Sequence, residues 1–219
     1  MAVALVVFAN LPWWPVYLRG FLTGSLLAGA LWMAAWIVWV TSGLSVRLNG
    51  TWAEEAVLSS LRKAARVHDV VPSLKFGKRD IDAVAVTPAA VYAIETKWRG
   101  QKPGHASLVH DGHAAALAAR TLRLSLNGRG VPGDLVRPVL VVCGPGAREM
   151  ASSNVETPLG MVVVVPAVDF DRWLDSIPHG PIGPDYAAGL AAELHAHARR
   201  RDSLNVEAGP VLRHLGRVR

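Results

Sequence analysis

Three ionisable residues in two short apolar segments have the types and spacing of a metal-dependent hydrolytic site. Asp82 lies in the segment 79–86, and Glu95 and Lys97 lie in the segment 91–97. Both segments are rich in valine, isoleucine and alanine, and a four-residue break that contains Pro88 separates them. This pattern predicts an antiparallel β-hairpin with a short loop.

The predicted hairpin sets two carboxylates against each other. If Val86 pairs with Val91 across the loop, Asp82 stands directly opposite Glu95. Opposed residues have Cβ atoms roughly 4.5–5.5 Å apart, and like charges so placed destabilise a sheet. Two carboxylates among apolar neighbours therefore need a proton or a cation between them. Because side chains alternate along a strand, Lys97 shares the face of Glu95 and stands beside the pair.

A divalent metal ion at the two carboxylates would give the hairpin the chemistry of phosphodiester hydrolysis. Mg²⁺ prefers oxygen ligands, and a bound ion polarises a phosphate and lowers the pKa of its water. A nearby lysine can position that water or neutralise charge in the transition state. We therefore expect Asp82 and Glu95 to bind Mg²⁺ or Mn²⁺, with Lys97 assisting. The alternative is a surface hairpin on which Asp80 and Lys97 form a solvated ion pair and the acids face water.

These residues resemble the NERD (nuclease-related) domain, a branch of the PD-(D/E)XK, restriction-endonuclease-like nucleases. The resemblance is carried by Ile81-Asp82, the apolar run after it, and the segment 91–98 with the following Gly100. It is clearest over residues 49–100 and continues at the level of element order to about residue 174. It implies cleavage of DNA phosphodiester bonds, and it adds the carbonyl of Thr96 to the metal ligands.

An expected helix from Thr51 to about residue 66 supplies a further candidate. Ala53-Glu54 with Val57 and Leu61 is similar to the first helix of the family, which implies that Glu54 supports the metal shell. Thr51 and Glu54 also have the spacing of a capping box after a turn at Asn49-Gly50, which gives Glu54 a structural alternative. Family members often carry a glutamine near the start of a later helix, and here His113 or an alanine occupies that region.

Basic and aromatic side chains flank the hairpin, and we expect them to contact a nucleic-acid backbone, with the tryptophan available for stacking. The alternative is a solvated rim. The candidates are Lys75, Lys78, Arg79, Trp98, Arg99 and Lys102.

An uncharged segment between Arg19 and Arg47 predicts a membrane anchor in residues 1–48. Residues 20–44 are long enough to span a bilayer as a helix, and tryptophans in and before this segment are typical of interfacial belts. The excess of Lys and Arg after the span predicts that the main domain is cytoplasmic. Small residues at every fourth position, Gly20, Gly24 and Ala28, would allow a homodimer through this helix. Residues 1–18, which Pro12 and Pro15 interrupt, would form either an interfacial segment or a second, short span.

Charge and cysteine content limit the remaining functions. The formal net charge is +6, but residues 1–48 and 199–219 account for it, so the middle of the chain is about neutral. The single cysteine, Cys143, excludes an internal disulfide and a cysteine-based zinc site. Because it lies in an apolar run, we expect a buried strand thiol.

The order of expected elements describes an α/β protein with a central mixed sheet flanked by helices, as in the restriction-endonuclease-like core. After the hairpin we expect a helix over 112–126, strands over 136–143 and 161–165, and a short helix over 168–174. This predicts three parts: the anchor 1–48, a nuclease-related domain 49–177, and a C-terminal helix with a basic tail, 178–219. The competing function is a catalytically inactive binding or scaffold module at the membrane.

Overall fold

The computed structural model of the chain describes residues 15–41, 44–76, 79–127 and 132–215, and from residue 201 to 215 it describes the backbone alone. The chain divides into two compact units, Met1–Leu48 and Asn49–Arg219. Each unit is therefore described by itself.

Among its described residues, the first unit contains one long apolar helix, α2 (Val16–Thr41). Its segment Val16–Trp39 has a mean hydropathy of 1.8, and that length and composition are sufficient to cross a membrane. Trp32 and Trp36 are exposed on it. The helix begins and ends a few residues before the expected span of 20–44. The second, short span predicted in residues 1–18 falls almost wholly outside the described residues.

Helix α3 (Leu44–Lys63) begins earlier than predicted. Asn49 and Gly50 are helical, so the expected turn there and the capping box at Thr51 are wrong. A single glycine costs a helix interior only about 1 kcal/mol, so flanking helical residues can carry the chain through it. Within the second unit α3 buries Val57 and Leu61, the stripe that the sequence predicts, and it leaves Glu54 exposed.

Six strands form one mixed sheet in the order β1-β2-β3-β4-β6-β5. Strands β3, β4 and β6 run parallel, whereas β1, β2 and β5 pair antiparallel with their neighbours. The strands are β1 (Asp69–Phe76), β2 (Arg79–Val86), β3 (Val91–Trp98), β4 (Val136–Cys143), β5 (Ser153–Thr157) and β6 (Gly160–Pro166). The mixed α/β class is confirmed. Strand β5 was not predicted, because only two of its five side chains are buried.

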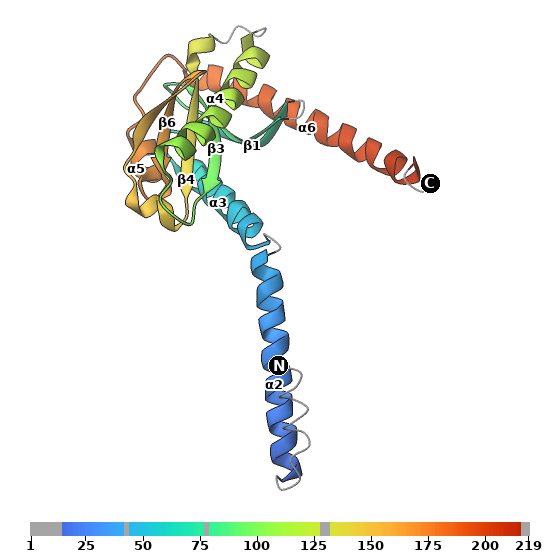
Figure 1. Ribbon diagram of the computed structural model, residues 1–219. Coiled ribbons are helices and arrows are strands. Elements are labelled where there is room, and N and C mark those ends of the chain that lie inside the picture. The colour runs from blue at the N-terminus through green and yellow to red at the C-terminus, as the bar shows by residue number, and fades with distance from the viewer. Residues whose placement is uncertain (1–14, 42–43, 77–78, 128–131, 216–219) are drawn as a thin grey trace. The chain divides into compact units, whose positions relative to one another are not determined.

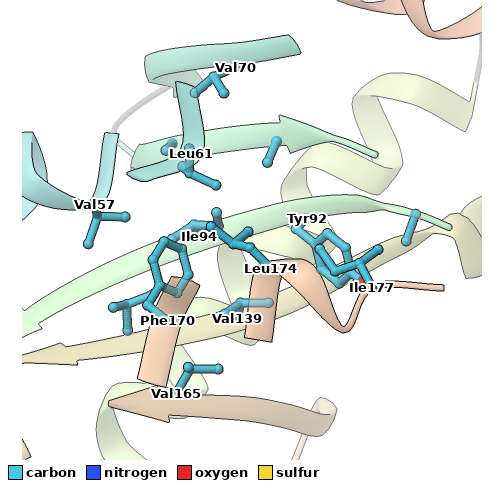
Figure 2. Packing of buried hydrophobic residues seen from close by; sticks show 14 of the residues in the cluster. Val57, Leu61, Val70, Tyr92, Ile94, Val139, Val165, Phe170, Leu174 and Ile177 are labelled. Atoms are coloured by element: carbon cyan, nitrogen blue, oxygen red, sulfur yellow. The ribbon is translucent and has the colours of Figure 1, made fainter. Parts of the chain in front are cut away.

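Helices cover both faces of the sheet (Figure 1). Helices α3 and α5 (Phe170–Asp175) pack on one face. Figure 2 shows Leu61 and Val57 of α3 and Phe170 of α5 gathered around Ile94 of β3. Helices α4 (His105–Asn127) and α6 (Pro184–Leu215) pack on the other face. Short 3₁₀ turns complete the unit: η1 (Gly133–Leu135), η2 (Pro145–Glu149) and η3 (Ala167–Asp169).

The C-terminal segment takes part in this core. Ile182, Leu190 and Leu194 pack with residues of β1, β2 and α4. The Ile182 N–H also donates to the carbonyl of Pro88 in the β2–β3 loop, at 3.0 Å. The sequence analysis set residues 178–219 apart as a C-terminal helix with a basic tail, whereas α6 extends to Leu215 and its first half packs into the core.

The β2–β3 hairpin forms with the predicted loop and register up to Ala83, which pairs with Ile94. Thr87 closes the loop: its N–H and its hydroxyl both donate to the carbonyl of Ala90, at 3.0 and 2.8 Å. The hairpin prediction is therefore confirmed.

The predicted pairing of Asp82 with Glu95 is wrong, because the described ladder between β2 and β3 ends at Ala83. Ile81 and Val84 are both buried on the α4 and α6 side, so the alternation of faces breaks between them. Across from Asp82 in β1, Ser73 has a positive φ of 50°, which interrupts the same point of the neighbouring strand. Both strands therefore change course at Asp82.

The predicted opposition of Asp80 and Lys97 is also absent. Asp80 pairs in register with Lys75 of β1, and their side chains form an exposed ion pair at 3.6 Å. The strands β2 and β3 have separated before this point, so Lys97 takes a different partner.

Candidate active site

Asp82 lies where β2 leaves its ladder with β3, and its side chain replaces the missing backbone pairing. Its Oδ2 accepts a hydrogen bond of 2.7 Å from the Thr96 N–H of β3. Burial first, and then the charge of Glu95, raise the pKa of Asp82 from its ordinary value of 3.8 to about 7. The Thr96 N–H and Lys97 act in the opposite direction without cancelling this effect. A half-buried acid beside a second, buried acid is thus held close to protonation at neutral pH.

Glu95 and Lys97 lie two residues apart in β3, on the same face as the alternation predicts. Glu95 is 9% exposed, and its Oε1 accepts a hydrogen bond of 2.6 Å from Lys97 Nζ. Burial lowers the pKa of Lys97, but the hydrogen bond with Glu95 and the charges of Glu95, Asp82 and Asp111 raise it above its ordinary value. Lys97 therefore remains a cation beside the two acids.

The other predicted site residues differ in their surroundings. Thr96 is buried between Glu95 and Lys97 in sequence, and its Oγ1 has no hydrogen-bond partner among the described residues. Glu54 is exposed on α3, yet its charge contributes to raising the pKa of Asp82. It therefore lies at the margin of the site rather than inside it.

Asp111 of α4 joins this group, and the sequence reasoning missed it. It is 3% exposed and forms an ion pair with Arg99, the residue that follows β3. Asp111 precedes Ala115 and Leu122 on the buried stripe of α4. An acidic residue in line with an apolar stripe was the available signal, because a buried carboxylate requires a partner.

The residues predicted to contact nucleic acid are not equivalent in the structure. Arg99 is committed to Asp111, and Trp98 packs partly buried against the α3 and α5 side of the core. Lys75 and Lys102 are exposed, Lys75 next to Asp80. Lys78 lies outside the described residues, and Arg79 is described only as the first residue of β2.

Two glycines fix the chain that leaves β3. The Arg99 N–H donates to the carbonyl of Cys143 at 2.8 Å, and the Arg99 carbonyl accepts from Gly146 N–H at 3.0 Å. Gly144 has a φ of 92°, and a Cβ there would approach the Arg99 carbonyl to 2.7 Å. A Cβ on Gly146 would overlap the backbone of Gln101. The close approach of two backbones therefore holds Arg99 in place.

The donors at this site are suited to a hard cation. Asp82 and Glu95 supply carboxylate oxygens, and repulsion between their charges raises the pKa of Asp82, so a cation here would be stabilised. Within the described ranges, no three His, Cys, Asp or Glu side chains are grouped to hold a metal ion. The residues therefore fit an ion such as Mg²⁺ that takes two carboxylates and completes its shell with water or phosphate. They do not fit a site built from protein ligands alone.

Comparison with known proteins bears on the same region. Residues 49–143 match the family model of the nuclease-related domain, NERD. A search of curated proteins found no match. The matched segment includes Glu54, Asp82, Glu95, Lys97 and Asp111. Residues 49–143 therefore form a nuclease-related domain, which belongs to the PD-(D/E)XK superfamily.

Proposed function

We propose that this protein is a membrane-anchored, divalent-metal-dependent nuclease that hydrolyses DNA phosphodiester bonds. The observation that carries the proposal is the grouping of Asp82, Glu95 and Lys97 inside a nuclease-related domain, where Asp82 Oδ2 accepts from the Thr96 N–H at 2.7 Å and Lys97 Nζ bonds to Glu95 Oε1 at 2.6 Å. Burial and then the charge of Glu95 raise the pKa of Asp82, which agrees with this grouping. Perturbed acids of this kind gather at functional sites, because a structural core has no need of two adjacent carboxylates. Lys97, held at 2.6 Å from Glu95, adds the cation that phosphodiester cleavage requires.

Each residue has a distinct part in the proposed reaction. Asp82 and Glu95, with the carbonyl of Thr96 as the family resemblance implies, would hold Mg²⁺ or Mn²⁺. When bound, the ion polarises the phosphate and lowers the pKa of a water molecule. Lys97 orients that water or offsets the negative charge that grows on the phosphate oxygens. Glu54 supports the acidic side of the site through its charge on Asp82.

The length and composition of α2 support the proposed membrane attachment. The helix is apolar over a length that spans a bilayer, and we propose that it crosses the membrane once. The Lys and Arg residues after the span support a cytoplasmic position for the domain by the positive-inside rule. The small residues Gly20, Gly24 and Ala28 give α2 a face on which a second copy can pack closely.

The proposal is tested with the full chain in detergent, assayed on plasmid and linear DNA with and without Mg²⁺ or Mn²⁺. Glu95→Gln keeps the size of the side chain but removes the charge that a hard cation requires. We expect metal binding and cleavage to fall by about 100-fold or more. Glu156→Gln, on an exposed residue of β5, is the matched control and should behave as wild type. Wild-type protein that binds no divalent metal and cuts no DNA would refute the proposal.

One observation favours a second function, a non-catalytic binding module at the membrane. Among the described residues no third acid or histidine completes a metal group, and Glu95 already has Lys97 as its counter-ion. In that case Glu95→Gln removes repulsion on Asp82 and stabilises the domain without loss of any activity. The same pair of variants therefore separates the two functions.

A further inference from the structure

Asp111 is a buried charge that the proposed hydrolysis does not use. Its carboxylate is 3% exposed on α4, and its partner is the guanidinium of Arg99. A carboxylate in this position is costly unless it is paired, and removing one partner of such a pair leaves the other charge uncompensated. The pair has a structural consequence in any case, because it connects α4 to the chain that leaves β3.

The surroundings of Arg99 indicate more than a connection between two elements. Both backbone polar groups of Arg99 are bonded, and Gly144 and Gly146 bring a second backbone against this segment. Asp111 then pairs with the guanidinium, so Arg99 is held both at its backbone and at the end of its side chain. Fixing a long cation to this degree costs conformational entropy that an ordinary surface charge does not pay.

Arg99 also retains hydrogen-bonding capacity. A guanidinium has five N–H donors, and the Arg99 side chain is 34% exposed. Its Nε is buried without a hydrogen-bond partner within the described part of the chain. Asp111 acts on Lys97 as well, since its charge is one of those that raise the pKa of Lys97. Asp111 therefore acts on two cations, by an ion pair with Arg99 and by its charge on Lys97.

We propose that Asp111 is a positioning residue, which orients the guanidinium of Arg99 beside Lys97 so that Arg99 binds a non-bridging oxygen of a nucleic-acid phosphate. The inference rests on the proposed function in one respect, that the ligand of the site is a phosphodiester. A planar guanidinium held by a carboxylate presents its remaining donors in a fixed direction, which suits phosphate oxygens.

The direction in which Asp111→Asn changes the affinity for DNA distinguishes a positioning role of Asp111 from a purely structural one. Asp111→Asn removes a negative charge, so simple electrostatics predicts unchanged or tighter binding of DNA. If Asp111 orients Arg99, the same substitution releases the guanidinium and weakens binding, by about fivefold to tenfold for one charge-assisted contact. Arg99→Gln should weaken binding to a similar extent, and it should reduce the slope of log affinity against log salt by about 0.9.

The experiment measures fluorescence anisotropy of a labelled DNA duplex with the full chain in a non-ionic detergent, in EDTA so that metal-dependent cleavage does not occur. Glu156→Gln and Arg120→Gln, both exposed residues, are the matched controls for loss of an acid and loss of an arginine. The double variant of Asp111 and Arg99 should bind no more weakly than Arg99→Gln alone, because the two act as one unit.

Each outcome decides the question. Weaker binding by Asp111→Asn, with non-additivity in the double variant, supports the positioning role. Unchanged or tighter binding overturns it and leaves nuclease activity of the wild type untouched. Wild type that binds DNA in EDTA but cleaves none in the separate assay with Mg²⁺ or Mn²⁺ removes the proposed reaction, while the Asp111 result still stands. Wild type that does not bind DNA in EDTA overturns the Asp111 inference, and the cleavage assay with metal still decides the proposed reaction by itself. If Asp111→Asn fails to fold, Arg99→Lys keeps the charge, and wild-type affinity in that variant overturns the inference.

Discussion

Replacing Asp82 by Asn should stabilise the domain at neutral and alkaline pH, although the residue is part of the candidate site. Asparagine keeps an oxygen that can accept the Thr96 N–H, and it removes the charge that burial and Glu95 disfavour. The pKa of Asp82 rises from 3.8 to about 7, and each unit corresponds to about 1.4 kcal/mol. The difference therefore sets an upper bound of about 4 kcal/mol, and we expect about 1–3 kcal/mol after relaxation and water penetration.

The effect has a defined dependence on pH. Below the unfolded pKa of 3.8 Asp82 is protonated in both states, and between 3.8 and about 7 only the folded state holds the proton. The stability that this proton confers is fully present below pH 3.8 and is lost as pH rises through about 7. The advantage of Asp82→Asn over wild type should thus be small at pH 4 and reach its maximum above pH 7.

Hydrogen exchange of the buried amides of β3 and β4 measures the stability difference between Asp82→Asn and wild type in the full chain. It reports on the domain separately from the detergent-bound helix. Asp80→Asn is the matched control: Asp80 lies two residues away on β2, in an exposed ion pair with Lys75. It should change stability by less than about 1 kcal/mol. Divalent metal should stabilise wild type and not Asp82→Asn. If Asp82→Asn is less stable than wild type at pH 8 without metal, burial and Glu95 do not disfavour the ionised form of Asp82 as we infer.

Three further predictions test other parts of the structure. Lys97→Met should lower the cleavage rate by about 100-fold or more while leaving metal binding largely intact, since its proposed role is in the transition state; equal loss of both in a metal titration would contradict that role. Gly146→Ala should destabilise the domain by at least about 2 kcal/mol in hydrogen exchange, because its Cβ would overlap the Gln101 backbone, whereas Gly100→Ala, with open space around it, should not. Protease added outside intact cells should spare the domain after residue 48 and digest it after lysis; digestion in intact cells would reverse the proposed orientation.

The sequence determined the parts of this protein that depend on local pattern. The apolar, β-prone segments around Pro88 predicted the hairpin, its loop and its register from Val86 to Ala83, because the alternation of faces and the loop length leave few other pairings. The uncharged segment after Arg19 predicted a helix able to span a membrane, because its length and composition alone satisfy that condition.

Tertiary structure decided how the acidic residues meet. Period-2 alternation extended past Ala83 places Asp82 opposite Glu95 in a ladder, but both β1 and β2 change course at this point. Asp82 instead reaches the Thr96 N–H with its side chain. The break turns Ile81 to the face of the sheet on which α4 and α6 pack. That packing depends on residues distant in the sequence, so the sequence of the hairpin alone did not predict the break.

Dependence on residues distant in the sequence also explains two other features that local pattern did not predict. Asn49-Gly50 is a local turn signal, yet α3 runs through it. The position of Asp111 in line with the apolar stripe of α4 indicated a buried acid, but its partner, Arg99, is set only when α4 packs on the sheet. Local sequence could place Glu95 and Lys97 on one face, because two residues in one strand fix that relation. The pairing of Asp111 with Arg99 is set by how a helix lies on a sheet, and only the folded chain specifies that.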